Sequence, residues 1–225
     1  MNYIELYRTI AAGEDLGRVS TWVVQLLTEI LDGRRHILAV RHPLGFICLP
    51  IERDEVNGVC LHVWDGEPAW TSTTSQVHAH SWDLFSYVLI GEVHNEVIEV
   101  ADDEVSPASR VFEVRSRGDV DELRATPRLV RHTRRATHVK PSGLWYRLPA
   151  GEFHTTVVPA GRTTATIALG STRRGGRDLS LGPIDGRSHS IRRQRCDRQE
   201  TMQVAQTVAD RAVACGVPHD GGRRP

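Results

Sequence analysis

The two ends of the chain have the hydrophobic spacing of helices. In residues 15–32, apolar side chains recur every three or four positions, the period of a helix that buries one stripe. Gly33 follows at the position where such a helix ends. We also expect a shorter helix from about Tyr3 to Ala12, and a C-terminal helix whose apolar face consists of Met202, Val204, Ala205, Val208, Ala209 and Ala212.

From His36 onward the pattern changes to short β-branched or aromatic runs, most of them separated by Gly, Pro, Asp or Asn. These runs are HILAVR, LGFICLPI, GVCLHVW, FSYVLIGEVHNEVIEV, RVFEVRS, LWYRL, FHTTVV and TTATIAL. Many short strands at modest spacing predict a mainly β fold, an antiparallel sandwich or barrel. Within the longest run, the chain is expected to turn tightly near Gly91.

Two stretches have weaker patterns. Residues 117–142 are polar, basic and interrupted by Pro127 and Pro141, which is compatible with edge strands or with a long loop. The sequence after Leu169 has the composition of irregular surface structure, and residues 215–225 are expected to form a disordered tail.

The domain organisation follows from these patterns. We expect an N-terminal helical segment over residues 1–34, a β-barrel over residues 35–175, and an extension over residues 176–225 that contains a short helix. A chain of 225 residues is long enough for one domain with a substantial core.

Composition and charge narrow the range of partners. The 28 basic and 28 acidic residues cancel, so net charge favours neither nucleic acid nor an anionic membrane. No apolar run approaches the roughly 18 residues that span a bilayer, and the N-terminus lacks the pattern of a signal peptide. We therefore expect a soluble, cytoplasmic protein. The four cysteines form no CxxC pair, which makes a disulfide framework or a thiolate zinc site unexpected.

Two histidines one residue apart stand out in the segment VHAHSWDLF. On a strand, residues two apart point to the same face, so His78 and His80 would direct both imidazoles into the same interior. This arrangement indicates a metal site, which needs at least one further ligand. The segment GLWYRLPAGEFHTTVV supplies a candidate in His154.

These residues resemble the two sequence motifs of the cupin superfamily. The second motif reads Gly, five residues, Pro-x-Gly, two residues and His, and the chain matches it at Gly143, Pro149, Gly151 and His154. Its frequent final Asn is replaced by Val158. The bend at Pro149 and Gly151 would aim the next strand so that His154 points into the barrel.

The first cupin motif is matched more loosely. His78 and His80 provide its His-x-His pair and Gly91 its closing glycine, whereas Ser72 replaces the opening glycine. The usual glutamate ligand would fall at Leu84 or Phe85 and is therefore lost.

With the glutamate lost, two ligand sets remain open. One is a three-histidine centre, similar to that of the thiol dioxygenase branch of the cupins. In the other, a bulge turns Asp83 inward as a fourth ligand. A structural role for Asp83, in orienting an imidazole or tying down a neighbouring loop, is the stronger expectation.

The strand before the second motif offers two catalytic candidates. If Tyr146 faces the cavity, it could donate a proton or position oxygen. If Arg147 faces the cavity, it could clamp a substrate carboxylate. His62 shares a strand face with Cys60 and Trp64 and either lines the pocket or packs in the core.

The resemblance implies oxygenase or isomerase chemistry on a small polar metabolite. We expect one divalent metal, Fe(II) in preference to Zn, Ni, Mn or Cu, with O₂ as a candidate second substrate and a homodimer as a candidate assembly. Two other functions fit the same residues. One is a non-catalytic binding or sensing cupin, and the other is a metal-free isomerase or epimerase that uses a His–Tyr acid–base pair.

Overall fold

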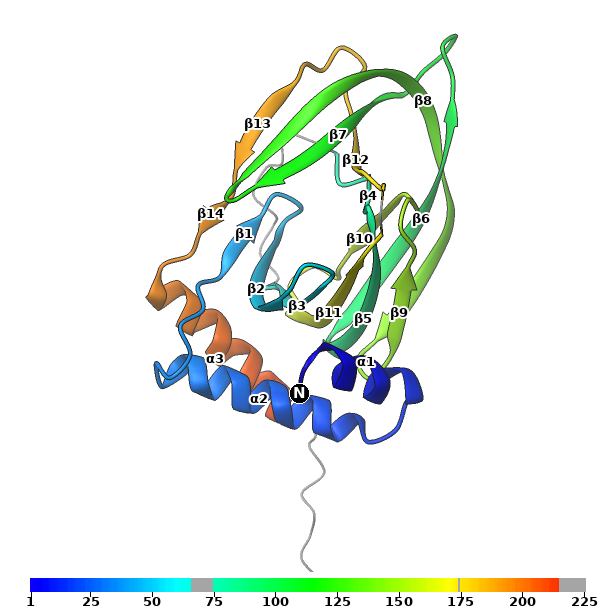
Figure 1. The fold of residues 1–225 in the computed structure, drawn as a ribbon. Helices are drawn as coiled ribbons and strands as arrows, with labels where there is room; N and C mark the ends of the chain where they lie inside the picture. The colour runs from blue at the N-terminus through cyan, green and yellow to red at the C-terminus, as the bar shows by residue number, and fades with distance from the viewer. Residues whose placement is uncertain (66–74, 174, 215–225) are drawn as a thin grey trace, which may run out of the picture.

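Two antiparallel β-sheets face each other, and helices pack against the outer side of one of them (Figure 1). The computed structural model describes residues 1–65, 75–173 and 175–214. The predicted fold class is confirmed: the chain is mainly β, a cupin-like antiparallel sandwich or barrel with N-terminal helices and a C-terminal helix.

The strands divide between the sheets as follows. The first sheet has the spatial order β14 (Gln194–Arg195), β1 (Val40–His42), β2 (Phe46–Arg53), β3 (Asn57–Trp64), β11 (Thr164–Thr172), β5 (Trp82–Ile90) and β9 (Trp145–Leu148). The second has the order β13 (His189–Arg192), β8 (Val120–Pro141), β6 (Glu92–Asp102), β10 (His154–Val157), β4 (His78–Ala79), β12 (Asp178–Gly182) and β7 (Ser109–Arg117). Because β7 also pairs with β8, the second sheet curls back on itself.

The expected helices are present at both ends of the described chain. They are α1 (Tyr3–Ala12), α2 (Leu16–Leu31) and α3 (Arg198–Ala214). A capping box sets the start of α1, since the Asn2 side chain accepts from the Glu5 amide at 3.0 Å and the Glu5 carboxylate accepts from the Asn2 amide at 2.9 Å. Among the described residues, no helix combines the length and the apolar character needed to cross a membrane.

Both faces of the first sheet are buried, one of them under the helices. Their apolar stripes pack on alternate residues of β2, β3, β5 and β11, including Leu49, Leu61, Phe85 and Ile167. The opposite face of the first sheet points to the second sheet and carries Leu84 and Val88 of β5, Tyr146 and Leu148 of β9, and Ala168 of β11. Because both faces are covered, β5 and β11 are buried almost continuously and lose the alternation of a half-exposed strand.

Residues 117–142 form a strand and not a long loop. The single strand β8 runs through them, pairing with β7 at its start and with β6 at its end. Pro127 lies where the β7–β8 register shifts, and Pro141 is the last residue of the strand. Both prolines therefore occupy positions where a missing N–H donor disturbs little of the ladder.

The expectation of irregular structure after Leu169 is wrong. β11 continues to Thr172, and β12, β13 and β14 follow, so strands extend past residue 175 into the predicted C-terminal extension. These strands are short, and they form because β4, β7, β8 and β1 supply their pairing partners. Such long-range pairing leaves no local signal in the sequence. The predicted disordered tail, residues 215–225, lies outside the described residues.

The turn expected near Gly91 is confirmed, and it joins the two sheets. β5 ends at Ile90 in the first sheet and β6 begins at Glu92 in the second. Gly91 has a φ of 75°, and a Cβ added there would lie 2.5 Å from Thr164 Oγ1 and 2.8 Å from the Thr163 carbonyl oxygen. Only glycine allows both the conformation and the close approach.

We therefore expect Gly91→Ala to lower the free energy of unfolding by about 2–4 kcal/mol, the sum of backbone strain and overpacking. Gly118→Ala is the matched control, because Gly118 has a φ of 61° but an added Cβ would meet nothing within 4 Å. It should cost only about 1 kcal/mol, from strain alone. Urea unfolding of both variants measures the difference, and equal losses would refute the role given to close packing at Gly91.

Candidate metal centre

The three histidines predicted from the sequence converge at the interface of β4 and β10. His154 is the register partner of His78 across these strands, and His80 follows two residues later. Their ring centroids lie 4.3 Å apart for His78 and His154, 4.7 Å for His78 and His80, and 5.1 Å for His80 and His154. One ligand nitrogen of each residue lies within 4.8 Å of the others, so a small adjustment would bring all three onto one ion.

Backbone carbonyls orient two of the imidazoles. The Nδ1 of His78 lies 2.8 Å from the Gln76 carbonyl oxygen, and the Nδ1 of His154 lies 3.0 Å from the Glu152 carbonyl oxygen. A carbonyl can only accept, so each Nδ1 carries the proton and donates it. The Nε2 atoms are left with free lone pairs, which is the tautomer that binds a metal.

Burial keeps all three rings neutral. It lowers the pKa of His78 to about 4 and the pKa of His154 to about 3. The pKa of His80 is also well below its ordinary value, first because of burial and then because His78 and His154 lie beside it. Neutral imidazole is the form that ligates metals, so the donor set fits a divalent ion near neutral pH.

An aromatic contact fixes the third ring. The Trp82 ring stacks on His80 with a centroid distance of 4.1 Å and an interplanar angle of 28°. Trp82 in turn lies over Gly170 of β11, where an added Cβ would come within 3.1 Å of the indole. The glycine makes room for the tryptophan, and the tryptophan holds the imidazole in place.

The bend of the second motif is fastened to the segment that bears His80. Gly151 has a φ of 83°, and its amide donates to the His80 carbonyl oxygen at 2.8 Å. The neighbouring Ala150 amide donates to Asp83 Oδ1 at 3.0 Å. These two hydrogen bonds set the path of the chain into β10 and therefore the position of His154.

Asp83 serves this structural role and is not in the ligand group. Besides the Ala150 amide, its carboxylate accepts from Arg173 Nε at 2.8 Å. The Arg173 guanidinium and then the Ala150 amide lower the pKa of Asp83 below its ordinary value, so the carboxylate is ionised and already paired. In the described part of the chain, the site gathers the three histidines and no carboxylate. Leu84 and Phe85, where the cupin glutamate would fall, are both buried apolar residues, and Ser72 lies outside the described residues.

The two catalytic candidates lie on opposite faces of β9. Tyr146 is buried on the barrel side, with its hydroxyl beside Ser86 and Asn95. Burial raises the pKa of Tyr146 above its ordinary value, and these two polar neighbours oppose the shift. Arg147 is exposed on the other face, opposite Phe85 in the register, and the structure does not bring it to the histidines.

Three further polar atoms surround Tyr146 or lie on the same inner face. Ser86 Oγ, Asn95 Nδ2 and Thr166 Oγ1 are buried and have no hydrogen-bond partner of good geometry among the described residues. Thr156, two residues after His154, donates to Asn95 Oδ1 at 3.0 Å and so ties this group to the histidine strand. Single Ser, Asn and Thr residues within strands give no sequence signal, so only the fold identifies the group.

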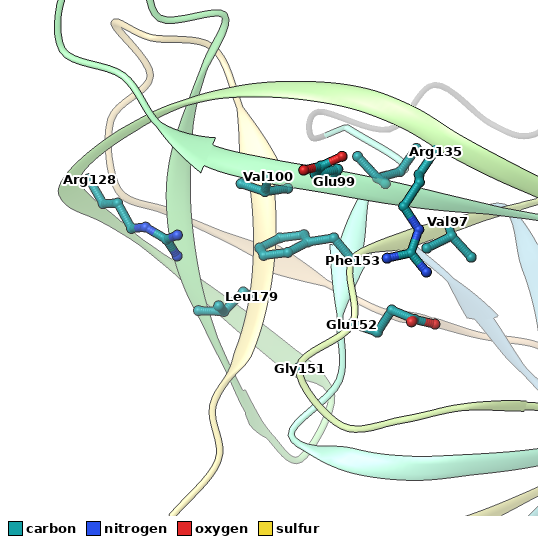
Figure 2. A pocket seen from close by; sticks show the side chains of 10 residues that line it. Val97, Glu99, Val100, Arg128, Arg135, Gly151, Glu152, Phe153 and Leu179 are labelled. Carbon is teal, nitrogen blue, oxygen red and sulfur yellow. The ribbon is translucent and has the colours of Figure 1, made fainter.

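A separate hollow is lined by residues of β6, β8 and β12 and by the segment before β10. Its volume is about 360 Å³, and its lining includes Phe153, Leu179, Arg128 and Arg135. Figure 2 shows the Phe153 ring between the two arginines. None of the three histidines is among the residues that line this hollow.

Comparisons with known proteins give remote structural likenesses. No family model and no curated protein sequence matches the chain. A candidate mannose-6-phosphate isomerase from Ralstonia eutropha JMP134 is 14% identical, with a TM-score of 0.33 over 57% of this chain and 85% of that one. Hydroquinone 1,2-dioxygenase PnpCD, solved with Cd²⁺ and 4-hydroxybenzonitrile, is 15% identical, with a TM-score of 0.33 over 55% of this chain and 62% of that one.

Hydroxypropylphosphonic acid epoxidase from S. wedmorenis is 12% identical, with a TM-score of 0.33, and the match covers 56% of this chain and 50% of the epoxidase. This chain thus spans half of the epoxidase and less than two thirds of the dioxygenase chain. Likeness at this level carries no functional argument, which must come from the chain's own residues.

The buried histidines predict a specific acid sensitivity of the metal-free protein. His154 has a folded-state pKa of about 3, below the unfolded value of about 6.5. Between these values the unfolded chain binds more protons, so stability rises with pH and is lost as the pH falls below about 6.5. We expect the free energy of unfolding to drop by about 1–2 kcal/mol for each such histidine between pH 7 and pH 5.

Urea unfolding at the two pH values measures this loss. His154→Gln is the reference, since glutamine is polar, of similar size and without a charge in this range. A variant that loses as much stability as the wild type on acidification would show that His154 is not the titrating group.

Proposed function

We propose that the protein is a metal-dependent enzyme of the cupin type, an Fe(II) oxygenase that acts on a small polar metabolite. The observation that carries the proposal is the meeting of three neutral imidazoles inside a β-barrel, with the Nε2 lone pairs of His78 and His154 free and with no carboxylate of the described residues in the group. His78, His80 and His154 would hold the ion. Three ligands from one side leave coordination positions for other molecules, as catalysis at a metal requires.

Among the divalent ions that three imidazoles can bind, we propose Fe(II). When bound, Fe(II) supplies electrons to O₂ and acts as a Lewis acid toward the substrate. Nitrogen-rich sites with open positions suit this chemistry better than the closed tetrahedral sites of structural zinc. The protein's contribution is to keep the imidazoles neutral, oriented and packed, through burial, the two carbonyl acceptors and Trp82.

Because the usual cupin glutamate ligand is replaced by an apolar residue, the charge of the metal ion indicates the class of substrate. A divalent ion among three neutral imidazoles keeps its full charge in a buried site, which is costly without a counter-charge. The polar groups of the inner face, Tyr146, Ser86, Asn95 and Thr166, are all neutral. An anionic substrate group would supply the missing charge, and we therefore propose a small carboxylate or thiol as the substrate.

The inner polar group would bind the rest of such a substrate. A buried donor or acceptor without a partner costs about 1–3 kcal/mol, which a hydrogen bond to the substrate would offset. Since the pKa of Tyr146 is raised, its hydroxyl keeps its proton at neutral pH. Tyr146 would thus donate a hydrogen bond or a proton to the substrate and would not act as a base.

We expect the purified full-length chain to bind about one equivalent of Fe(II) at this centre under anaerobic conditions. His154→Ala should weaken that binding at least 100-fold, because the variant loses one of the three imidazole ligands. The control His138→Ala removes an exposed histidine of β8 and should bind iron as the wild type does. Elemental analysis after gel filtration measures both. Equal iron content in His154→Ala and the wild type would contradict the assigned ligands.

The activity is tested by O₂ uptake. Fe(II)-loaded protein should consume O₂ with members of a panel of small carboxylates and thiols, and not with neutral sugars. Tyr146→Phe should keep its iron and lower kcat by about 10- to 100-fold, the range typical of a lost proton donor or hydrogen bond. Metal-free protein that binds or isomerises a panel compound as well as loaded protein would instead support a binding cupin or an isomerase.

A further inference from the structure

The inner face of the β2–β3 hairpin carries a second group of metal-binding side chains. Val59, Leu61 and Val63 of β3 pack toward the helices, so the residues between them, Cys60 and His62, point to the barrel interior. Cys48 does the same on β2, between the buried Ile47 and Leu49.

The register brings these three side chains together. Cys48 is paired directly with His62, and Cys60 is paired with Pro50, two residues further along each strand. The two sulfurs and one imidazole nitrogen all lie within 4.8 Å of one another. The Cys60 thiol thus lies beside both Cys48 and His62. Ligands of one tetrahedral zinc ion lie about 3.5–4 Å apart, so the group is close to a binding geometry.

The same register argues against a disulfide. Cys48 and Cys60 are diagonal neighbours on antiparallel strands, for which Cα atoms lie about 7–8 Å apart. A disulfide requires a Cα separation of about 4.4–6.8 Å, so closing one would need the backbone to move. A metal ion spans the longer separation between two sulfurs without that strain.

Aromatic rings enclose the histidine of this group. The Phe46 ring lies 4.4 Å from the His62 ring and stacks on His42 at the same distance and an angle of 5°. The Trp64 ring lies 5.3 Å from Phe46 and 6.3 Å from His62 in an edge-on arrangement. Packing of this kind holds a ligating imidazole in one orientation and limits the access of water.

We propose that Cys48, Cys60 and His62 form a second metal site, distinct from the three-histidine centre and specific for a thiophilic ion such as Zn²⁺. Binding would release the protons of the two thiols, leaving two thiolates and one neutral imidazole on the ion. Thiolates select zinc and other soft or borderline ions, whereas three imidazoles do not. The sequence expectation that a thiolate zinc site is absent is therefore revised, since the β-hairpin supplies the proximity that a CxxC motif would otherwise provide.

Cobalt titration of the reduced, metal-free full-length chain tests the proposal. Co²⁺ bound to thiolates gives an intense near-ultraviolet charge-transfer band, which imidazole ligands do not produce. We expect this band to saturate at one equivalent and Zn²⁺ to abolish it by displacement. Cys48→Ser and Cys60→Ser should each lose most of the band, whereas His154→Ala should keep it and lose only binding at the other centre.

A control double variant, Cys196→Ala with Cys215→Ser, removes the other two of the four cysteines and should keep the full band. By elimination it assigns the band to Cys48 and Cys60 even if their own variants fail to fold. The proposal is overturned if the wild type gives no thiolate band, or if the band disappears in this control. Wild-type protein that binds iron at the histidine centre but gives no thiolate band would overturn this site alone, whereas a thiolate band without iron binding would overturn the proposed function alone.

Discussion

The candidate metal centre depends on how the second-motif bend is attached to the segment before β5. Two hydrogen bonds, from the Gly151 amide to the His80 carbonyl and from the Ala150 amide to Asp83, fasten the bend to the residues around His80. The pairing of His154 with His78 completes the arrangement. Three imidazoles from two distant parts of the sequence thus share one point because backbone hydrogen bonds, which are short and directional, fix both chain paths.

The helices contribute to this centre without touching it. The helices cover the outer face of β5 and β11 and the second sheet covers the inner face, so these strands, which carry Trp82, Ser86 and Thr166, are buried on both sides. A site on rigid strands keeps its ligands in place with little entropic cost on binding. The low pKa values of His78 and His154 come first from the burial of their rings inside the barrel.

The sequence predicted those features whose signal is local. The helical stripes, the β-branched runs, the glycine at the sheet corner and the three histidines all follow from period, turn chemistry or motif spacing. It failed for β12 and β13, whose polar residues pair only because distant strands offer partners. Arg147 is a further example. Strand alternation places Arg147 and Tyr146 on opposite faces of β9, but it does not show which of the two residues faces the barrel interior.

The cysteine group could not be predicted from the sequence for the same reason. Cys48 and Cys60 are twelve positions apart, a spacing that matches no metal motif and that only the hairpin register makes meaningful. The two ligand sets of the barrel also differ in charge, one neutral and the other carrying two thiolates once a metal binds. In a buried interior, where charge is poorly screened, this difference gives each set its own preference for the ion and for the charge of any further ligand. A neutral centre that needs an anionic substrate can therefore lie in the same barrel as a thiolate centre that already balances a divalent ion.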